Sequence, residues 1–351
     1  MATHKPRART GRGLGFGWLL SGSCLTLVFL VMVSAGLGYI RIPVTDVARA
    51  IFSLVSPDSM VSEEIRAVIV DVRLPRILAS VLVGAGLAVS GAVFQGILLN
   101  PLSDPYTLGI SAGAAFGAAV AIVLAPGFSQ VSIPLSAFAG ASATLFVVIF
   151  LAGSGREGRG GLSSSNLILS GIMVSAILAA GISFLKYLAD EQVSVIVFWL
   201  MGSFTSAAWS HALVLLAVIV PGFAVFFYYA RDLNLMTFGE RSAGTLGVDT
   251  GKITVILLVT ASFITAVCVS VSGIIGFVGL LVPHMVRLMA GPDNRKLLPL
   301  SLVLGGVLLL AADTVTRAVL PSEIPIGVLT ALIGGPVFCY LFKRSHMAKG
   351  R

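Results

Sequence analysis

The chain has 351 residues, of which 57% are hydrophobic and only 11% charged, with a net charge of +8. A soluble domain carries about 25% charged residues, so this composition excludes an ordinary soluble protein. Apolar runs recur at about the 20-residue length that crosses a bilayer as a helix, whereas a transmembrane β-barrel would alternate over segments of about 10 residues. We therefore expect an all-α polytopic membrane protein. The positive charge is typical of cytoplasmic loops, and we expect no nucleic-acid partner.

The first apolar run, 14–39, follows the basic segment 1–13. A secretory signal peptide has the same order, but its apolar core is only about 7–15 residues long, so we interpret the run as a retained first helix. Nine further runs predict transmembrane helices, at 76–99, 106–126, 132–152, 166–188, 211–230, 252–272, 274–290, 301–320 and 324–342.

Ten helices place both termini on one side of the membrane. With that side cytoplasmic, most of the 23 lysines and arginines face the cytoplasm, as the positive-inside rule requires. This topology makes 1–13 a cytoplasmic tail, 41–75 an outer loop and 231–251 a cytoplasmic segment. The apolar stretch 193–206 is too short to span and is predicted to be interfacial or re-entrant on the outer side. We expect one transmembrane domain, 1–351.

The stretch 97–113 contains two prolines and an aspartate between long apolar runs. Because proline ends helical runs, it predicts a tight cytoplasmic turn at 100–105, with Asp104 in water and capping a helix that begins near Tyr106. Glycines then recur every four residues, at Gly109, Gly113 and Gly117. This spacing predicts close packing of the third helix against its neighbours.

The chemistry-bearing residues are few. Cys24, Cys268 and Cys339 are scattered singly, which predicts packing residues, with no zinc site or disulfide framework. Asp313 and Arg317 lie four residues apart on one helix and can form an ion pair. "GVDTGK" at 247–252 lacks the spacing of a phosphate-binding loop. We therefore expect no catalytic residue, no resident metal and no cofactor, and a source of energy in partner proteins.

"VRLPRILASVLVGAGLAVSGAVFQGILLNPLSDPYTLGISAGAAFGA" (72–118) resembles the signature of the FecCD permease family. These proteins are the membrane subunits of binding-protein-dependent ABC importers for iron–siderophore, haem and vitamin B12. Similar blocks follow in the family's order, at 238–248, 272–288, 310–319 and 323–338. The resemblance implies a vitamin B12 importer-like bundle of ten helices, and a single permease domain whose segment 231–251 couples to an ATPase.

The same resemblance implies partners and a location. Two copies of the chain would form a homodimer in the cytoplasmic (inner) membrane of a prokaryote, surrounded by membrane lipid. Two cytoplasmic ATP-binding subunits would supply the energy. A periplasmic or lipid-anchored substrate-binding protein would deliver the solute.

Residue roles follow from the resemblance as well. Arg73, Arg76 and Arg317 match outer-surface arginines that meet acidic residues of the binding protein, a pairing for which arginine is well suited. Segment 237–248 matches the part that couples to the ATPase, with Glu240, Arg241, Ala243 and Gly247 as contact candidates and Gly239 and Gly244 at tight turns. Asn100, Leu102, Ser163 and Ser164 match two inner gate loops.

The expected function is ATP-driven import of an iron–siderophore, with vitamin B12 or haem as alternatives. An ion-coupled secondary transporter is a second hypothesis, but it requires carboxylates at mid-membrane that the sequence does not convincingly show. An intramembrane enzyme is a third, and it requires a catalytic constellation that the sequence lacks.

Overall fold

The computed structural model describes residues 15–38, 42–52, 62–124, 132–153, 162–318 and 323–349. These residues form helices and connecting turns, with no β-strand among them, which confirms the predicted all-α fold. Seven helical stretches are long and apolar enough to cross a membrane, and three shorter apolar helices accompany them. Each of the ten predicted runs overlaps one of these stretches; the count of ten crossings itself stays a prediction.

The seven long stretches are α1 (Phe16–Gly36), the continuous run of α3 (Glu63–Ala67), a π-helix (Val68–Arg73) and α4 (Leu74–Ile97), α6 (Ser132–Gly153), α7 (Ser164–Leu188), α9 (Trp209–Tyr228), α12 (Thr250–Ser272) and α14 (Asn294–Ala318). The shorter apolar helices are α5 (Ile110–Leu124), α13 (Val278–Ala290) and α15 (Ile326–Lys349). Short helices α2 (Val44–Phe52), α8 (Val193–Leu200), α10 (Ala230–Met236) and α11 (Glu240–Thr245) connect them.

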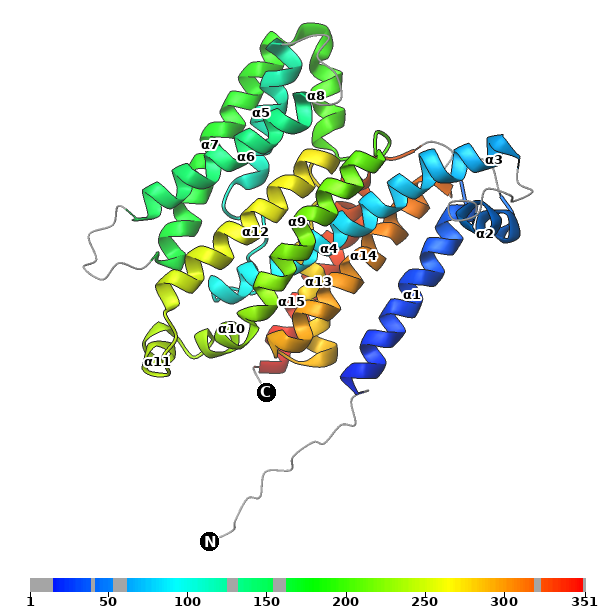
Figure 1. Cartoon of the computed structure of the whole chain (residues 1–351). Coiled ribbons are helices and arrows are strands. Elements are labelled where there is room, and N and C mark those ends of the chain that lie inside the picture. Colours follow the sequence, from blue (N-terminus) through cyan, green and yellow to red (C-terminus); the bar gives the residue numbers. More distant parts are fainter. Residues whose placement is uncertain are drawn as a thin grey trace.

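Helix α4 lies inside the bundle, with α9, α12, α13 and α14 around it (Figure 1). Its closest neighbour is α14. At their crossing, a Cβ added to Gly84 would lie 2.3 Å from the carbonyl oxygen of Gly305, so the two backbones are in direct contact. In lipid, helices associate through such close packing, because the hydrophobic effect does not favour one apolar contact over another.

The predicted glycine packing of the third helix is confirmed. A Cβ on Gly113 would lie 2.6 Å from the carbonyl oxygen of Gly140 in α6, and one on Gly117 would lie 2.1 Å from that of Ser136. Gly109 precedes α5 and has φ +77°, a conformation that favours glycine.

The segment predicted as an outer loop, 41–75, is largely helical where the structure describes it. It contains α2, α3 and the π-helix that runs into α4. The π-helix ends at Arg73, two residues before Pro75, which has no N–H to donate to a carbonyl of the preceding turn. At this boundary Leu74 N donates to Ile69 O, five residues earlier, which is the bond that defines a π turn. Charged residues along this stretch hid its helical character from a search for apolar runs.

Two helix starts also differ from expectation. α5 begins at Ile110, four residues after the predicted start, because 98–109 is a looped segment that returns toward the middle of the bundle, where Pro105 packs on Gly279 of α13. α14 begins at Asn294, seven residues before the predicted 301. A search for apolar runs missed this start because the first turns of the helix contain polar residues and Pro299.

The start of α1, the end of α15 and helix α11 lie at one end of the bundle (Figure 1). We call this the α11 end, and the opposite end, where α4 begins and α14 finishes, the arginine end. That the α11 end is cytoplasmic stays a prediction.

Candidate functional site

At the arginine end, Arg76 of α4 lies between two carboxylates. Its Nη2 and Nε bind Asp313 Oδ1 of α14 at 2.9 and 3.1 Å, and its Nη1 binds Glu323 Oε1, just before α15, at 3.2 Å. The Asp313 side chain is 1% exposed, Arg76 14% and Glu323 47%. The pair with Asp313 is therefore buried, whereas the pair with Glu323 opens to the surface.

Arg73 and Arg317 do something different, because both bind the end of α1. Arg73 Nη1 donates to Ala35 O at 2.6 Å, and Arg317 donates to Ser34 O at 2.5 Å and to Leu37 O at 2.9 Å. The last carbonyl groups of a helix have no partner within the helix and attract positive charge. These two arginines therefore cap the end of α1.

The expectation that all three arginines lie on the outer surface is corrected here. The side chains of Arg73 and Arg317 are buried, and the predicted pair of Arg317 with Asp313 is present at 3.4 Å. Arg76 is the member of the three that lines an open cavity. The docking role of the arginines is untested and stays a prediction.

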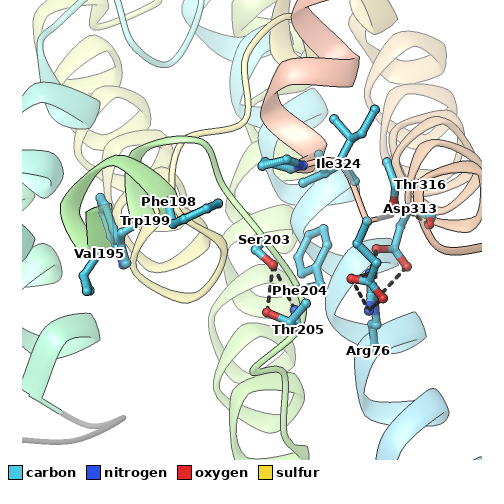
Figure 2. Close-up of a pocket in the computed structure, with 13 residues that line it drawn as sticks. Arg76, Val195, Phe198, Trp199, Ser203, Phe204, Thr205, Asp313, Thr316 and Ile324 are labelled. Atoms are coloured by element: carbon cyan, nitrogen blue, oxygen red, sulfur yellow. Dashed lines mark hydrogen bonds and ion pairs between the residues drawn. The ribbon is translucent and has the colours of Figure 1, made fainter. Parts of the chain in front are cut away.

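The cavity beside Arg76 has a volume of about 460 Å³. Figure 2 shows Phe198 and Trp199 of α8 on one side, Arg76 and Asp313 on the other, and Ser203, Phe204 and Thr205 between them. The Ser203 and Thr205 hydroxyls lie 2.9 Å apart. The apolar stretch 193–206 thus contains a helix of eight residues, too short to span, followed by a turn at the cavity. The cavity combines an aromatic wall with a charged wall.

At the α11 end, the two predicted gate loops lie together. Ser164, the first residue of α7, places its Oγ 3.5 Å from Ile97 O at the end of α4. Asn100 Oδ1 accepts from Leu102 N at 3.0 Å, and the Leu102 side chain is exposed. Ser163 precedes α7 in an extended conformation without a side-chain capping bond. Their gating role stays a prediction.

The loop that follows is fixed by partly buried polar contacts. Asp104 Oδ1 accepts from Tyr106 N at 3.0 Å and from Thr107 Oγ1 at 2.9 Å, and Tyr106 OH donates to Ile275 O at 2.7 Å. Asp104 therefore closes a turn inside the loop. The expectations that it caps the next helix and sits in water are wrong, since α5 begins at Ile110 and Asp104 is half-buried.

The predicted coupling segment, 237–248, contains α11 and is largely exposed at its end of the bundle. Glu240 and Arg241 are exposed. Gly239 and Gly247 have φ of +92° and +85° and make the turns on either side of α11.

Two details of this segment differ from expectation. Ala243 is fully buried, so its side chain packs α11 onto the bundle and is not available to a partner. Gly244 lies inside α11 without a positive φ, so the second tight turn is at Gly247. The coupling role itself is untested.

Residues outside the predicted set join these features. Glu323 completes the environment of Arg76, and Asn234 of α10 binds the start of α14 through Asp293 and Asn294. Glu323 lies in the block 323–338, which resembles the FecCD permease family. Its position in the sequence does not indicate that it contacts Arg76. No motif in the sequence marks Asn234, and its partner Asp293 lies 59 positions away.

Comparison with known proteins places this arrangement among transport proteins. The model of the FecCD transport family matches residues 26–344. The cobalamin import system permease protein BtuC of Halobacterium salinarum is 44% identical over 81% of this chain and 75% of its own length. The hemin transport system permease protein HmuU of Yersinia pestis is 38% identical over 95% of this chain and 96% of its own.

A solved structure gives the same result for the fold. A chain of a metal-chelate type ABC transporter in an inward-facing conformation superposes with a TM-score of 0.82. The match covers 93% of this chain and 99% of that one, at 33% sequence identity.

Proposed function

Because this chain belongs to the FecCD transport family, we propose that it is the membrane permease subunit through which an ABC importer moves a metal chelate. The observation that carries the proposal is the placement of two specialised features at opposite ends of one bundle. A charged cavity with Arg76 lies at the arginine end, and the exposed helix α11 lies at the other. An importer of this class needs one surface for a solute-delivering protein and one for an ATPase.

Arg76 supports docking at the arginine end. Charged groups at the edge of an interface steer the partner and set its register. We infer that an acidic side chain of the binding protein meets Arg76, while Arg73 and Arg317 hold the end of α1 behind it. The exposed α11 would contact two ATP-binding subunits, with two copies of this chain forming the transport path in a prokaryotic cytoplasmic membrane.

The charge environment of Asp313 argues against an ion-coupled transporter. A proton carrier in a membrane needs a carboxylate that gains and loses a proton as the protein works. Asp313 is buried, and two arginines contact it, Arg76 at 2.9 Å and Arg317 at 3.4 Å. Such a carboxylate is suited to a structural ion pair.

Iron–siderophore is the substrate expected from the sequence resemblance, and cobalamin is a second candidate. The 44% identity to the cobalamin import permease of Halobacterium salinarum favours cobalamin. The 38% identity to the hemin transport permease of Yersinia pestis favours haem. The metal of a chelate stays enclosed by its own ligands during transport. A transport path for a chelate therefore needs no metal-ligating side chains.

The test is uptake into liposomes that contain the permease with its ATPase subunits, with the binding protein added outside. We expect ATP-dependent uptake of one of three probes: a ferric hydroxamate siderophore, haemin or cyanocobalamin. The probe that is taken up identifies the substrate class. Uptake by the permease alone, driven by a proton gradient, would overturn the proposal.

A further inference from the structure

A cluster of amide and carboxylate groups joins helix α10 to the start of α14. Asn234 Nδ2 donates to Asp293 Oδ1 at 2.7 Å, and Asn234 Oδ1 accepts from Asn294 N at 2.9 Å and from Asn294 Nδ2 at 2.8 Å. Asp293 Oδ1 also accepts from Arg295 N at 3.0 Å. We call Asn234, Asp293 and Asn294 the Asn234 clamp.

The clamp caps a helix from two directions. The first N–H groups of an α-helix have no partner inside the helix, and a side-chain oxygen usually satisfies them from the adjacent residue. Here Asp293 satisfies the N–H of Arg295 in the ordinary way. The N–H of Asn294, which is buried, is satisfied by Asn234, from a different helix. Asp293 therefore caps α14 locally, and α10 adds the acceptor for the N–H of Asn294.

The charge of Asp293 fits this role. Burial by itself raises the pKa of the Asp293 carboxyl, but hydrogen bonds from Arg295 N and Asn234 Nδ2, with the charges of Lys296 and Arg295, lower it overall. The carboxylate is an anion at neutral pH and a strong acceptor for the Asn234 amide.

The clamp lies at the α11 end of the bundle, and α14 leads from it to the arginine end. α10 runs directly into α11 through Gly239, so a force on α11 acts first on α10. α14 is a single 25-residue helix, and near its other end Asp313 binds Arg76 beside the cavity. The predicted ATPase contact is thus joined to the arginine end in four steps: the chain from α11 to α10, the hydrogen bonds of Asn234, the helix α14, and the ion pair of Asp313 with Arg76.

We propose that Asn234 is a positioning residue that makes α14 follow the movement of the α11 segment, so that ATP hydrolysis is coupled to solute passage. This inference rests on the proposed function. The Asn234 clamp carries the movement because its bonds fix the start of α14 to α10, and a packed helix moves as a unit. Without the clamp, α10 and α11 can move while α14 stays in place.

The experiment compares Asn234→Leu with a swap of the two hydrogen-bonding groups. The complete complex is reconstituted in liposomes with whichever of ferric hydroxamate, haemin or cyanocobalamin the natural protein imports. For Asn234→Leu we expect the solute imported per ATP hydrolysed to fall about tenfold, within the range of typical coupling between sites. Basal ATP hydrolysis and the affinity for the binding protein should stay unchanged, which a general folding defect would not allow.

The double variant Asn234→Asp/Asp293→Asn returns an amide donor to the pair, once the new amide at position 293 turns its oxygen toward Arg295 N and its nitrogen toward position 234. We expect it to restore the import ratio, whereas Asn234→Asp alone opposes two carboxylates and should lower the ratio even if the leucine variant does not assemble. Arg231→Gln is the matched control, because its side chain is exposed on α10, one turn before Asn234.

Three results would each overturn the clamp. They are an unchanged ratio in both single variants, a swap that fails to restore a lowered ratio, and an equal loss in Arg231→Gln. Failure of the proposed function looks different. In that case the natural protein itself shows no ATP-dependent uptake of any probe.

Discussion

Arg76 Nη1 binds Glu323 Oε1 at 3.2 Å, so the guanidinium nitrogen that is not bonded to Asp313 already has a carboxylate partner within the chain. Its Nε and Nη2 are occupied by the buried Asp313. An acidic side chain of a docking protein must therefore share Arg76 with Glu323 or displace it. The two carboxylates of the site have separate roles: Asp313 fixes the arginine, and Glu323 occupies the face that a partner would use.

Replacing Glu323 by Gln should strengthen docking of the binding protein. Glu323 is half-exposed, and such pairs contribute up to about 1 kcal/mol, so we expect affinity to rise by at most about fivefold. Binding of the purified binding protein to the permease complex in nanodiscs at low salt measures this. Weaker binding in Glu323→Gln would show that Glu323 contributes to the interface.

Replacing Arg73 by Met should lower stability with little effect on docking. The substitution keeps an unbranched stem but removes the guanidinium, and it leaves Ala35 O at the end of α1 without its buried donor, at a cost of about 1–3 kcal/mol. Thermal unfolding in detergent and binding-protein affinity are measured on the same sample. A large loss of affinity with unchanged stability would assign Arg73 to docking.

The contact between α4 and α14 predicts a contrast between two glycine-to-alanine changes. Gly84→Ala places a methyl group 2.3 Å from Gly305 O, so the helices must separate, and overpacking of this kind costs about 1–3 kcal/mol. Gly22→Ala in α1 is the control, since no atom lies within 4 Å of its new Cβ, and alanine favours the helix. Equal thermal stability of the two variants would contradict the close contact.

Gln95 and Pro283 predict a compensating pair. Pro283 has no N–H for the carbonyl of Gly279, four residues earlier in α13, and Gln95 Nε2 of α4 donates to that oxygen at 3.3 Å. Arg287 holds the Gln95 amide from the other side. Gln95→Leu should therefore cost about 1–3 kcal/mol by leaving these groups unpaired.

In the Gln95→Leu background, Pro283→Ala should recover part of the lost stability, because the new N–H of Ala can bind Gly279 O. The same change in the natural background should give a smaller gain. A double-mutant cycle on thermal stability measures the difference. Strict additivity would show that Gln95 does not substitute for the missing backbone bond.

The sequence by itself determined the class of the protein and the position of most helices. Apolar runs set α6, α7 and α12 to within two residues of their observed bounds, because lipid requires each span to satisfy its backbone internally and to be apolar throughout. Sequence blocks were enough to name the family, and glycine spacing predicted that α5 packs closely against a neighbour, which the structure shows to be α6. These are local properties that a linear pattern records.

Only the tertiary structure decided which polar groups meet. Arg73, Arg76 and Arg317 read alike in the sequence, yet two bind the end of α1 and one faces a cavity, because α1, α4 and α14 converge there. Asn234 and Asp293 are 59 positions apart, and Arg76 and Glu323 are 247 apart. Such contacts depend on how the helices pack against one another. Which side chain of one helix meets which side chain of another leaves no periodic signal along the chain.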